Sequence, residues 1–323
     1  MFVKNDHPAS VINPPASTNG AEGHRIPPRL IAGGRFLLFA LVMVAALLSI
    51  RFLLTTNRTT AGLLKAANSG YLDAALVWIV DSGALAVVLV YIVIAARREK
   101  RSLSAYGLPL RASCRKHWTA GLLLGFALAS LDIVATRLLG GYSFGRPELS
   151  LRGIVEHGLL WGGAFILVGI YEECLYRGYA LKTLAEAIGF WPAAVVLALA
   201  FGMLHLLNPG ESAIGALDVI AYALLASFTL MRTGSLWFAI GVHSAWDFSL
   251  TFLFSAPGSG LAARGSLLHS SLHGSAWLTG GTAGPEGSVV GLCVLVLGFL
   301  FCYQFLPQKG TRHSDARRSS RLR

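Results

Sequence analysis

Eight apolar stretches, each close to the length of a membrane-spanning helix, alternate with polar segments along this 323-residue chain. A helix needs about 20 apolar residues to cross a hydrocarbon core of roughly 30 Å. We therefore predict transmembrane helices at about 36–54, 74–96, 118–140, 156–181, 192–207, 214–231, 236–255 and 287–306. The fifth and sixth stretches are short. The predicted fold class is all-α, a polytopic membrane helical bundle of about eight transmembrane helices.

Lysine and arginine residues set the expected orientation of this bundle, because they are enriched in the cytoplasmic loops of membrane proteins. They cluster in the loop after the second apolar stretch and in the C-terminal tail, and several precede the first stretch. The other loops carry only scattered basic residues. We therefore expect both termini on the cytoplasmic side (N-in/C-in), as an even number of spans allows.

The same pattern divides the chain into three segments. Residues 1–34 are polar and rich in Pro, Ser and Asn, which predicts a disordered cytoplasmic tail. Residues 35–306 form the predicted transmembrane helical domain, in which the Gly- and Ser-rich segment 256–286 is expected to be a flexible outer loop. Residues 307–323 form a basic cytoplasmic tail. The first apolar run starts at Phe36, too late for a signal peptide, so we expect it to be retained as a helix.

The composition favours a membrane protein over a soluble one. Hydrophobic residues make up 54% of the chain and charged residues only 13%, against about 25% in soluble domains. The net charge of +11 lies in segments that flank apolar runs, so we attribute it to membrane topology and expect no nucleic-acid partner. The four cysteines are scattered and show neither a disulfide framework nor a metal-type CxxC pair.

Three groups of polar side chains interrupt the apolar stretches, within 171–177, 201–205 and 243–247. A charge at bilayer depth costs at least about 2.5 kcal/mol, so such residues usually face a protein interior or a wet cavity. The groups contain the i,i+4 pairs Glu173 and Arg177, Phe201 and His205, and His243 and Asp247, each of which lies on one helix face. At a helical rise of about 1.5 Å per residue from the helix ends, all three groups lie near the middle of the bilayer and can converge there.

These residue types can support hydrolysis. A carboxylate beside a neutral imidazole can take a proton from water, and nearby donors can stabilise the oxyanion of a tetrahedral intermediate. The sequence contains neither a Gly-x-Ser-x-Gly elbow nor a His-Glu-x-x-His zinc motif. Two histidines and one carboxylate are also a plausible zinc ligand set, so a metal-dependent hydrolase with zinc as its cofactor is one alternative.

The ordered motifs Glu-Glu-x-x-x-Arg, Phe-x-x-x-His and His-x-x-x-Asn/Asp on apolar helices resemble the CPBP family, the CAAX protease and bacteriocin-processing (ABI) family of intramembrane glutamic endopeptidases. The resemblance covers a core of about residues 150–255. It implies that Glu172 activates the attacking water with the help of His205, and that His243 and Asp247 polarise the scissile carbonyl and hold its oxyanion. It implies no cofactor.

The resemblance also suggests supporting roles. Glu173 and Arg177 would brace the site as an ion pair, and we interpret Phe201 and Trp246 as packing around the cavity. Asp247 departs from the pattern, because many family members have Asn at this position and an ionised Asp cannot donate to an oxyanion. We expect Asp247 to accept a hydrogen bond from His243 and orient its ring, with a protonated Asp247 as the alternative.

The expected function is an intramembrane endopeptidase that cleaves a membrane-associated protein or peptide, such as a prenylated CaaX-type protein, in the cytoplasmic half of the bilayer. Its expected partners are this substrate and the lipid bilayer, and its expected location is the cytoplasmic (inner) membrane of a bacterium. A bacteriocin-immunity or scaffold protein, or a proton-coupled membrane protein, is the alternative from another class. No sequence spacing connects the acidic residues Asp81, Asp132, Asp218 and Glu156 to the three motifs, so we assign them no role.

Overall fold

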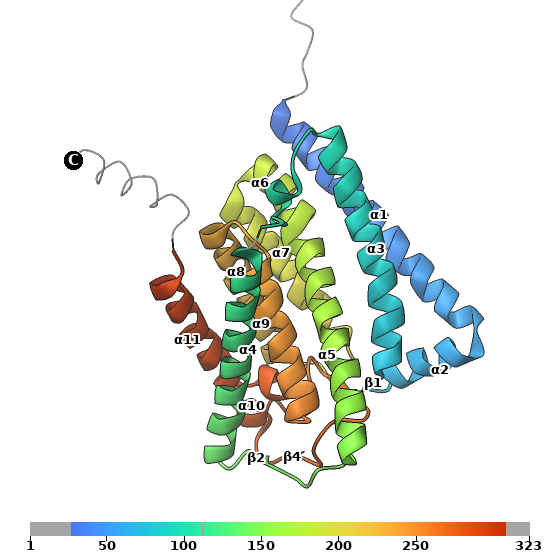
Figure 1. The fold of residues 1–323 in the computed structure, drawn as a ribbon, viewed down its shortest axis with the longest axis vertical. Helices are drawn as coiled ribbons and strands as arrows, with labels where there is room; N and C mark the ends of the chain where they lie inside the picture. Colours follow the sequence, from blue (N-terminus) through green and yellow to red (C-terminus); the bar gives the residue numbers. More distant parts are fainter. Residues whose placement is uncertain (1–26, 112, 308–323) are drawn as a thin grey trace, which may run out of the picture.

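The computed structural model describes residues 27–111 and 113–307, and its regular structure is almost entirely helical (Figure 1). The α-helices are α1 (Pro28–Thr56), α2 (Arg58–Ala67), α3 (Ala74–Arg98), α4 (Ser113–Leu138), α5 (Leu151–Glu173), α6 (Leu181–Ile188), α7 (Phe190–His205), α8 (Ala213–Thr233), α9 (Trp237–Asp247), α10 (Ala276–Thr279) and α11 (Val289–Phe305). Short 3-10 or π-helical segments are η1 (Leu103–Tyr106), η2 (Cys174–Ala180), η3 (Phe248–Leu253), η4 (Gly281–Ala283) and η5 (Pro285–Gly287). The strands β1 (Tyr71–Leu72) and β3 (Ala262–Ala263) pair in parallel, and β2 (Tyr142–Ser143) and β4 (Ser271–Leu272) pair antiparallel.

Each apolar stretch predicted from the sequence coincides with helical structure. These helices are α1, α3, α4, α5 with η2, α7, α8, α9 with η3, and α11. Among the described residues, five helical segments are long and apolar enough to cross a membrane, namely α1, α3, α4, α8 and the continuous helix Leu151–Ile188. The apolar helices α7 and α11 are shorter, with 16 and 17 residues. The helical architecture is thus confirmed, while the count of eight spans and the N-in/C-in orientation stay predictions.

The first helix begins earlier than the hydrophobic pattern indicated. Pro28 is its first residue, where the fixed φ of proline suits a helical start and the missing N–H costs no hydrogen bond. Residues 28–34, predicted as the end of a disordered tail, are therefore helical. The rest of that predicted tail, up to residue 26, and residues 308–323 lie outside the described residues.

One end of the bundle gathers the basic segments. The start of α1, the segment between α3 and α4, the helix α6, the turn between α8 and α9 and the end of α11 meet there. The contacts that join them are the ion pairs Arg35–Glu99 and Arg101–Glu186 and the hydrogen bonds from Leu236 N–H to the Gly107 carbonyl and from Arg232 to the Leu306 carbonyl. We call this end the basic end.

The opposite end, which we call the loop end, is formed by the connecting segments 68–73, 139–150, 206–212 and 254–288. Residues 256–286, predicted as a flexible outer loop, fold against it: β3 pairs with β1, β4 pairs with β2, and Thr282 donates to the Gly210 carbonyl. Gly210 and Gly260 pack backbone against backbone, so that a side chain at either would collide with the other. Backbone hydrogen bonds therefore order this segment, although its composition alone suggested no ordered structure.

Glycines bring α4 and α9 into close contact. A Cβ at Gly121 would collide with the Phe238 carbonyl oxygen, and a Cβ at Gly125 with the carbonyl oxygen of Val242, the residue before His243. Two glycines four residues apart are the usual means by which membrane helices approach closely. This contact sets the position of α9, which carries one of the three motifs.

The helices α5 and α9 both change into π-helical turns directly after residues of the predicted site. The segment η2 follows Glu173, and η3 follows Asp247. Gly178 leaves helical geometry inside η2 (φ −77°, ψ −105°), which kinks the helix before α6. Single π-helical turns within α-helices are frequent at functional sites. The i,i+4 spacing in the sequence does not reveal these turns.

Candidate active site

The side chains predicted to carry the chemistry line one cavity. Glu172 comes from α5, His205 from the end of α7, and His243 and Asp247 from α9. The cavity has a volume of about 1080 Å³, including its open mouth, and apolar side chains of α1, α3 and α5 form part of its wall. The structure thus brings together three motifs that are separated along the chain.

His243 is the centre of the polar contacts in this site. Its Nδ1 lies 3.0 Å from Oε1 of Glu173, and its Nε2 lies 3.5 Å from Oε2 of Glu172 and 3.5 Å from Oδ2 of Asp247. An ionised Glu173 can only accept a hydrogen bond, so Nδ1 carries a proton. Two further carboxylates face Nε2 and favour a proton there as well, which would make His243 a donor toward the cavity.

Glu173 is fully buried and holds three donors at once. Its Oε1 accepts from His243, from the Tyr222 hydroxyl at 3.2 Å and from the Arg177 guanidinium at 3.4 Å. The expected ion pair between Glu173 and Arg177 is therefore present. The guanidinium also lies over the Phe201 ring, 4.7 Å from its centroid, in a cation–π contact. These contacts offset part of the cost of burying two charges, while Oε2 of Glu173 and Nη2 of Arg177 have no hydrogen-bond partner among the described residues.

The carboxylate closest to the His243 ring is Glu173, not Asp247. The i,i+4 spacing on α9 led us to expect Asp247 as the group that orients this ring. Asp247 is the more distant partner at 3.5 Å, whereas Glu173 approaches from the neighbouring helix α5. Asp247 instead faces the cavity with 19% of its side chain exposed, as does Glu172 with 22%. This difference depends on how α5 and α9 are rotated relative to each other. The spacing of residues along one helix does not determine that rotation.

His205 is oriented by the helix that carries it. Its Nδ1 lies 2.8 Å from the Phe201 carbonyl oxygen, one turn earlier, and its ring packs against the Phe201 ring with centroids 4.5 Å apart. A carbonyl only accepts, so Nδ1 carries the proton and Nε2 is left as an acceptor. Phe201, interpreted from the sequence as packing, thus positions His205 through both its ring and its backbone.

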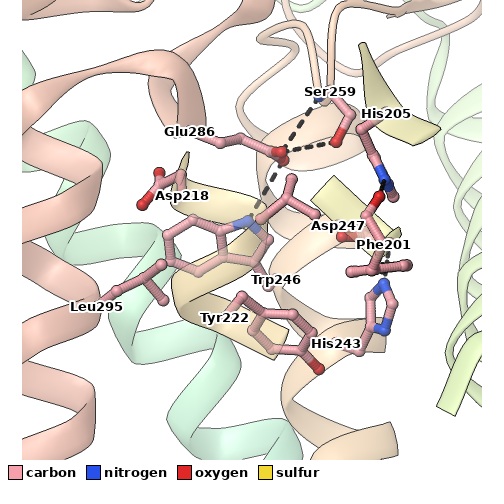
Figure 2. A pocket seen from close by; sticks show the side chains of 11 residues that line it. Phe201, His205, Asp218, Tyr222, His243, Trp246, Asp247, Ser259, Glu286 and Leu295 are labelled. Atoms are coloured by element: carbon pink, nitrogen blue, oxygen red, sulfur yellow. Dashed lines mark hydrogen bonds and ion pairs between the residues drawn. The ribbon is translucent and has the colours of Figure 1, made fainter. Parts of the chain in front are cut away.

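Sequence reasoning missed two residues of this site. Tyr222 on α8 donates to Glu173, and Glu286 in η5 reaches inward from the segment predicted as a flexible loop (Figure 2). Glu286 accepts from the Ser259 hydroxyl at 2.8 Å, from the Ser259 N–H at 3.2 Å and from the Trp246 indole at 3.3 Å. The only signals were one tyrosine in an apolar stretch and one acid among glycines and serines, and neither has a spacing that points to the motifs.

A smaller chamber, of about 410 Å³ including space open to solvent, adjoins the main cavity. Its lining includes Asp218, Tyr222, Trp246 and Glu286, with Leu295 contributed by α11 (Figure 2). Burial raises the pKa of Glu286 above its ordinary value, although the hydrogen bond from Ser259 opposes the shift. Trp246, expected to pack around the cavity, lines this chamber and holds Glu286.

The other acids singled out in the sequence are dispersed. Asp81 lines the main cavity, whereas Asp132 is buried on α4 and accepts from Thr136. Glu156 is exposed and pairs with Arg152. Within residues 27–111 and 113–307, no group of three or more His, Cys, Asp or Glu side chains is arranged to hold a metal ion.

A comparison with protein families agrees with this geometry. Residues 155–249 match the model of one family, described as type II CAAX prenyl endopeptidase Rce1-like, and this range contains all three motifs. No significant match to a curated protein or to a solved structure was found. The family match and the long apolar helices together identify an integral membrane protein. Over residues 155–249, this chain is thus similar to the Rce1-like family of type II CAAX prenyl endopeptidases.

Proposed function

We propose that this protein is an intramembrane endopeptidase that hydrolyses a peptide bond of a membrane-associated protein or peptide with glutamate-activated water. The Rce1-like domain supports the reaction class. The observation that carries the proposal is that Glu172, His205, His243 and Asp247 line one cavity. Within it, Nδ1 of His243 is hydrogen-bonded to the buried Glu173.

Glu172 is the proposed base. It is partly exposed to the cavity, whereas Glu173 is buried and engaged by Arg177, so only Glu172 is free to contact a water molecule. In the first step, Glu172 takes a proton from this water, and the oxygen attacks the carbonyl carbon of the substrate. The acceptor Nε2 of His205 would orient the same water.

His243 is the proposed donor to the oxyanion. With Nδ1 bound to Glu173, its Nε2 proton can point to the oxygen of the tetrahedral intermediate, where a fixed donor stabilises developing charge. Asp247 would keep that nitrogen protonated. In the second step, Glu172 returns its proton to the leaving nitrogen, the carbon–nitrogen bond breaks, and a carboxylic acid and an amine are released.

The cavity wall suggests a substrate that is anchored in the membrane. Leu47 of α1, Val77 of α3 and Leu204 of α7 line the cavity together with the catalytic side chains, so an apolar surface adjoins the polar site. A lipid chain or an apolar helix can lie against such a wall. We propose either a lipidated protein, the class named in the description of the matching family, or a membrane-spanning substrate.

Substitution of Glu172 tests the reaction. The purified Glu172→Gln protein should lose all cleavage of a prenylated or membrane-bound reporter peptide, because the amide cannot accept the water proton. Glu156→Gln is the matched control, since Glu156 lies on the same helix, is exposed and pairs only with Arg152 among the described residues. Full activity of Glu172→Gln would exclude this mechanism.

The zinc-dependent alternative is decided by the same assay. Two histidines and two carboxylates in one cavity have the donor chemistry of a zinc site. A glutamate mechanism predicts that cleavage survives exhaustive chelation, whereas a zinc hydrolase would lose activity and regain it when zinc is restored. Metal analysis of the active, purified protein gives an independent measurement.

A further inference from the structure

The smaller chamber beside the main cavity is a space that the proposed mechanism does not use. The two spaces share part of their walls, because His205, His243 and Asp247 line both. Asp218 and Leu295 lie on one side of the chamber, and the two histidines lie on the other (Figure 2). A substrate side chain next to a peptide bond held at these histidines is therefore within reach of the chamber.

Asp218 on α8 is a buried acid whose carboxyl group has no partner among the described residues. The residue is 2% exposed and lines the chamber, and neither of its carboxyl oxygens has a hydrogen-bond partner in the described part of the chain. Burial of a carboxylate is costly unless the group is paired. A bound ligand that brings a positive charge would supply the missing partner.

The surroundings of this carboxyl group favour a cation over an anion. The first turn of α11 packs against it, since a Cβ at Gly291 would lie 2.6 Å from its Oδ2, and the N-terminal end of a helix stabilises a negative charge. Asp247 and Glu286 add two more carboxyl groups to the lining, and among the described residues no lysine or arginine lines the chamber. His243 is the opposing group, and its Nδ1 is already bound to Glu173.

Aromatic and aliphatic side chains form the rest of the chamber wall. The rings of Phe201, Tyr222 and Trp246 line it together with Leu295. The indole of Trp246 is held in place by its hydrogen bond to Glu286. Such a wall can cover the methylene chain of a lysine or arginine, and aromatic faces attract its charged end. An apolar wall beside an unpaired carboxyl group therefore suits a long basic side chain.

From these observations we infer that the chamber binds a lysine or arginine side chain of the substrate, located next to the scissile bond, with Asp218 as its counter-charge. The inference rests on the proposed function and adds a sequence preference to it. Asp218 contacts the substrate away from the reacting atoms, so it determines specificity and is not a catalytic residue. A neutral side chain would leave this carboxyl group unpaired, and the site therefore discriminates against it.

The cleavage products of a random peptide library test this preference. The purified wild-type protein is reconstituted in liposomes with membrane-anchored peptides of random sequence, and mass spectrometry identifies the cleaved bonds. At one position beside the cleaved bond, we expect Lys and Arg to be enriched about tenfold or more over Met and Gln, which are long but uncharged. Cleavage without such enrichment would overturn the inference and leave the proposed function standing.

Substitution of Asp218 tests the assigned counter-charge. Two reporter peptides that differ only in Lys or Met at the enriched position are cleaved by each variant, and the ratio of the two kcat/KM values is measured. In Asp218→Asn this ratio should fall about tenfold or more. The matched control is Asp73→Asn, which changes an acid that caps α3 and does not line the chamber, and it should keep the wild-type ratio. An unchanged ratio in Asp218→Asn would overturn the inference.

Binding of n-butylammonium, the charged end of a lysine side chain, tests the chamber without any cleavage. The Glu172→Gln protein, with and without Asp218→Asn, is titrated in detergent while its melting temperature is recorded. We expect a saturable rise that uncharged 1-butanol does not produce and that Asp218→Asn abolishes. The absence of this rise, or an equal rise in both proteins, would overturn the inference. If no library peptide is cleaved, the proposed function fails, and this titration alone decides whether the chamber binds a cation.

Discussion

At the scale of single residues, Glu172 and Glu173 show how two adjacent carboxylates take different parts. Successive residues on a helix point about 100° apart, so only one of the two can face the cavity while the other faces the packed interior. Glu173 receives three donors in the interior, and Glu172 keeps a solvent-facing carboxylate. The different roles predicted for Glu172 and Glu173 therefore have a geometric basis.

Stability measurements can distinguish the structural role of Glu173 from the cavity-facing role of Glu172. Glu173→Gln should destabilise the protein by about 3–5 kcal/mol, because it leaves the buried Arg177 guanidinium without its counter-charge. Glu172→Gln should change stability by less than about 1 kcal/mol, since its carboxylate faces the cavity. Unfolding of the detergent-solubilised proteins gives both values. Equal destabilisation by the two changes would contradict this assignment.

At the scale of elements, the position of α9 depends on its glycine contact with α4. The glycines at 121 and 125 let the backbones touch near Phe238 and Val242, and His243 follows directly. The geometry of the proposed active site is thus tied to a helix–helix contact that involves none of the proposed catalytic side chains. The sequence shows the two glycines but not which helix they meet.

Adding one methyl group at this contact should disturb the site. Gly125→Ala places a Cβ against the Val242 carbonyl, so α4 and α9 must move apart at a cost of about 1–3 kcal/mol, and cleavage should fall as His243 shifts. Gly33→Ala is the matched control, because no atom lies within 4 Å of the added Cβ and alanine favours the helix. Melting temperature and cleavage rate report the two effects, and unchanged values for Gly125→Ala would show that the contact is not tight.

At the scale of the whole molecule, the outer segment 256–288 and the helical core form one unit through Glu286. This carboxyl group links Ser259 at the loop end to Trp246 on α9, next to Asp247. The segment therefore contributes to the lining of the cavity and does not merely connect two helices.

Removal of this link should free the segment. Glu286→Ala removes an acceptor of three hydrogen bonds, so limited proteolysis between residues 262 and 276 should accelerate about tenfold or more, and cleavage activity should decrease. Glu156→Ala, at an exposed acid near the start of α5 that pairs with Arg152 on the same helix, is the control and should behave as wild type. If both variants resist proteolysis equally, Glu286 does not hold the segment.

The sequence by itself determined the helical membrane architecture and the three motifs. Both follow from local rules: apolar length decides whether a helix can cross a bilayer, and a period of 3.6 residues places i,i+4 side chains on one face. The three motifs singled out Glu172, His205, His243 and Asp247 through their resemblance to a known family, and the same resemblance with the i,i+4 spacing suggested the ion pair of Glu173 and Arg177. They could not give the rotation of one helix against another.

Only the tertiary structure decided which groups meet across helices. It made Glu173 the closest carboxylate to His243, added Tyr222 from α8, and brought Glu286 in from a segment that its composition marked as a flexible loop. These features depend on packing between segments far apart in the chain, where close contact is decided by shape and backbone pairing rather than by local spacing.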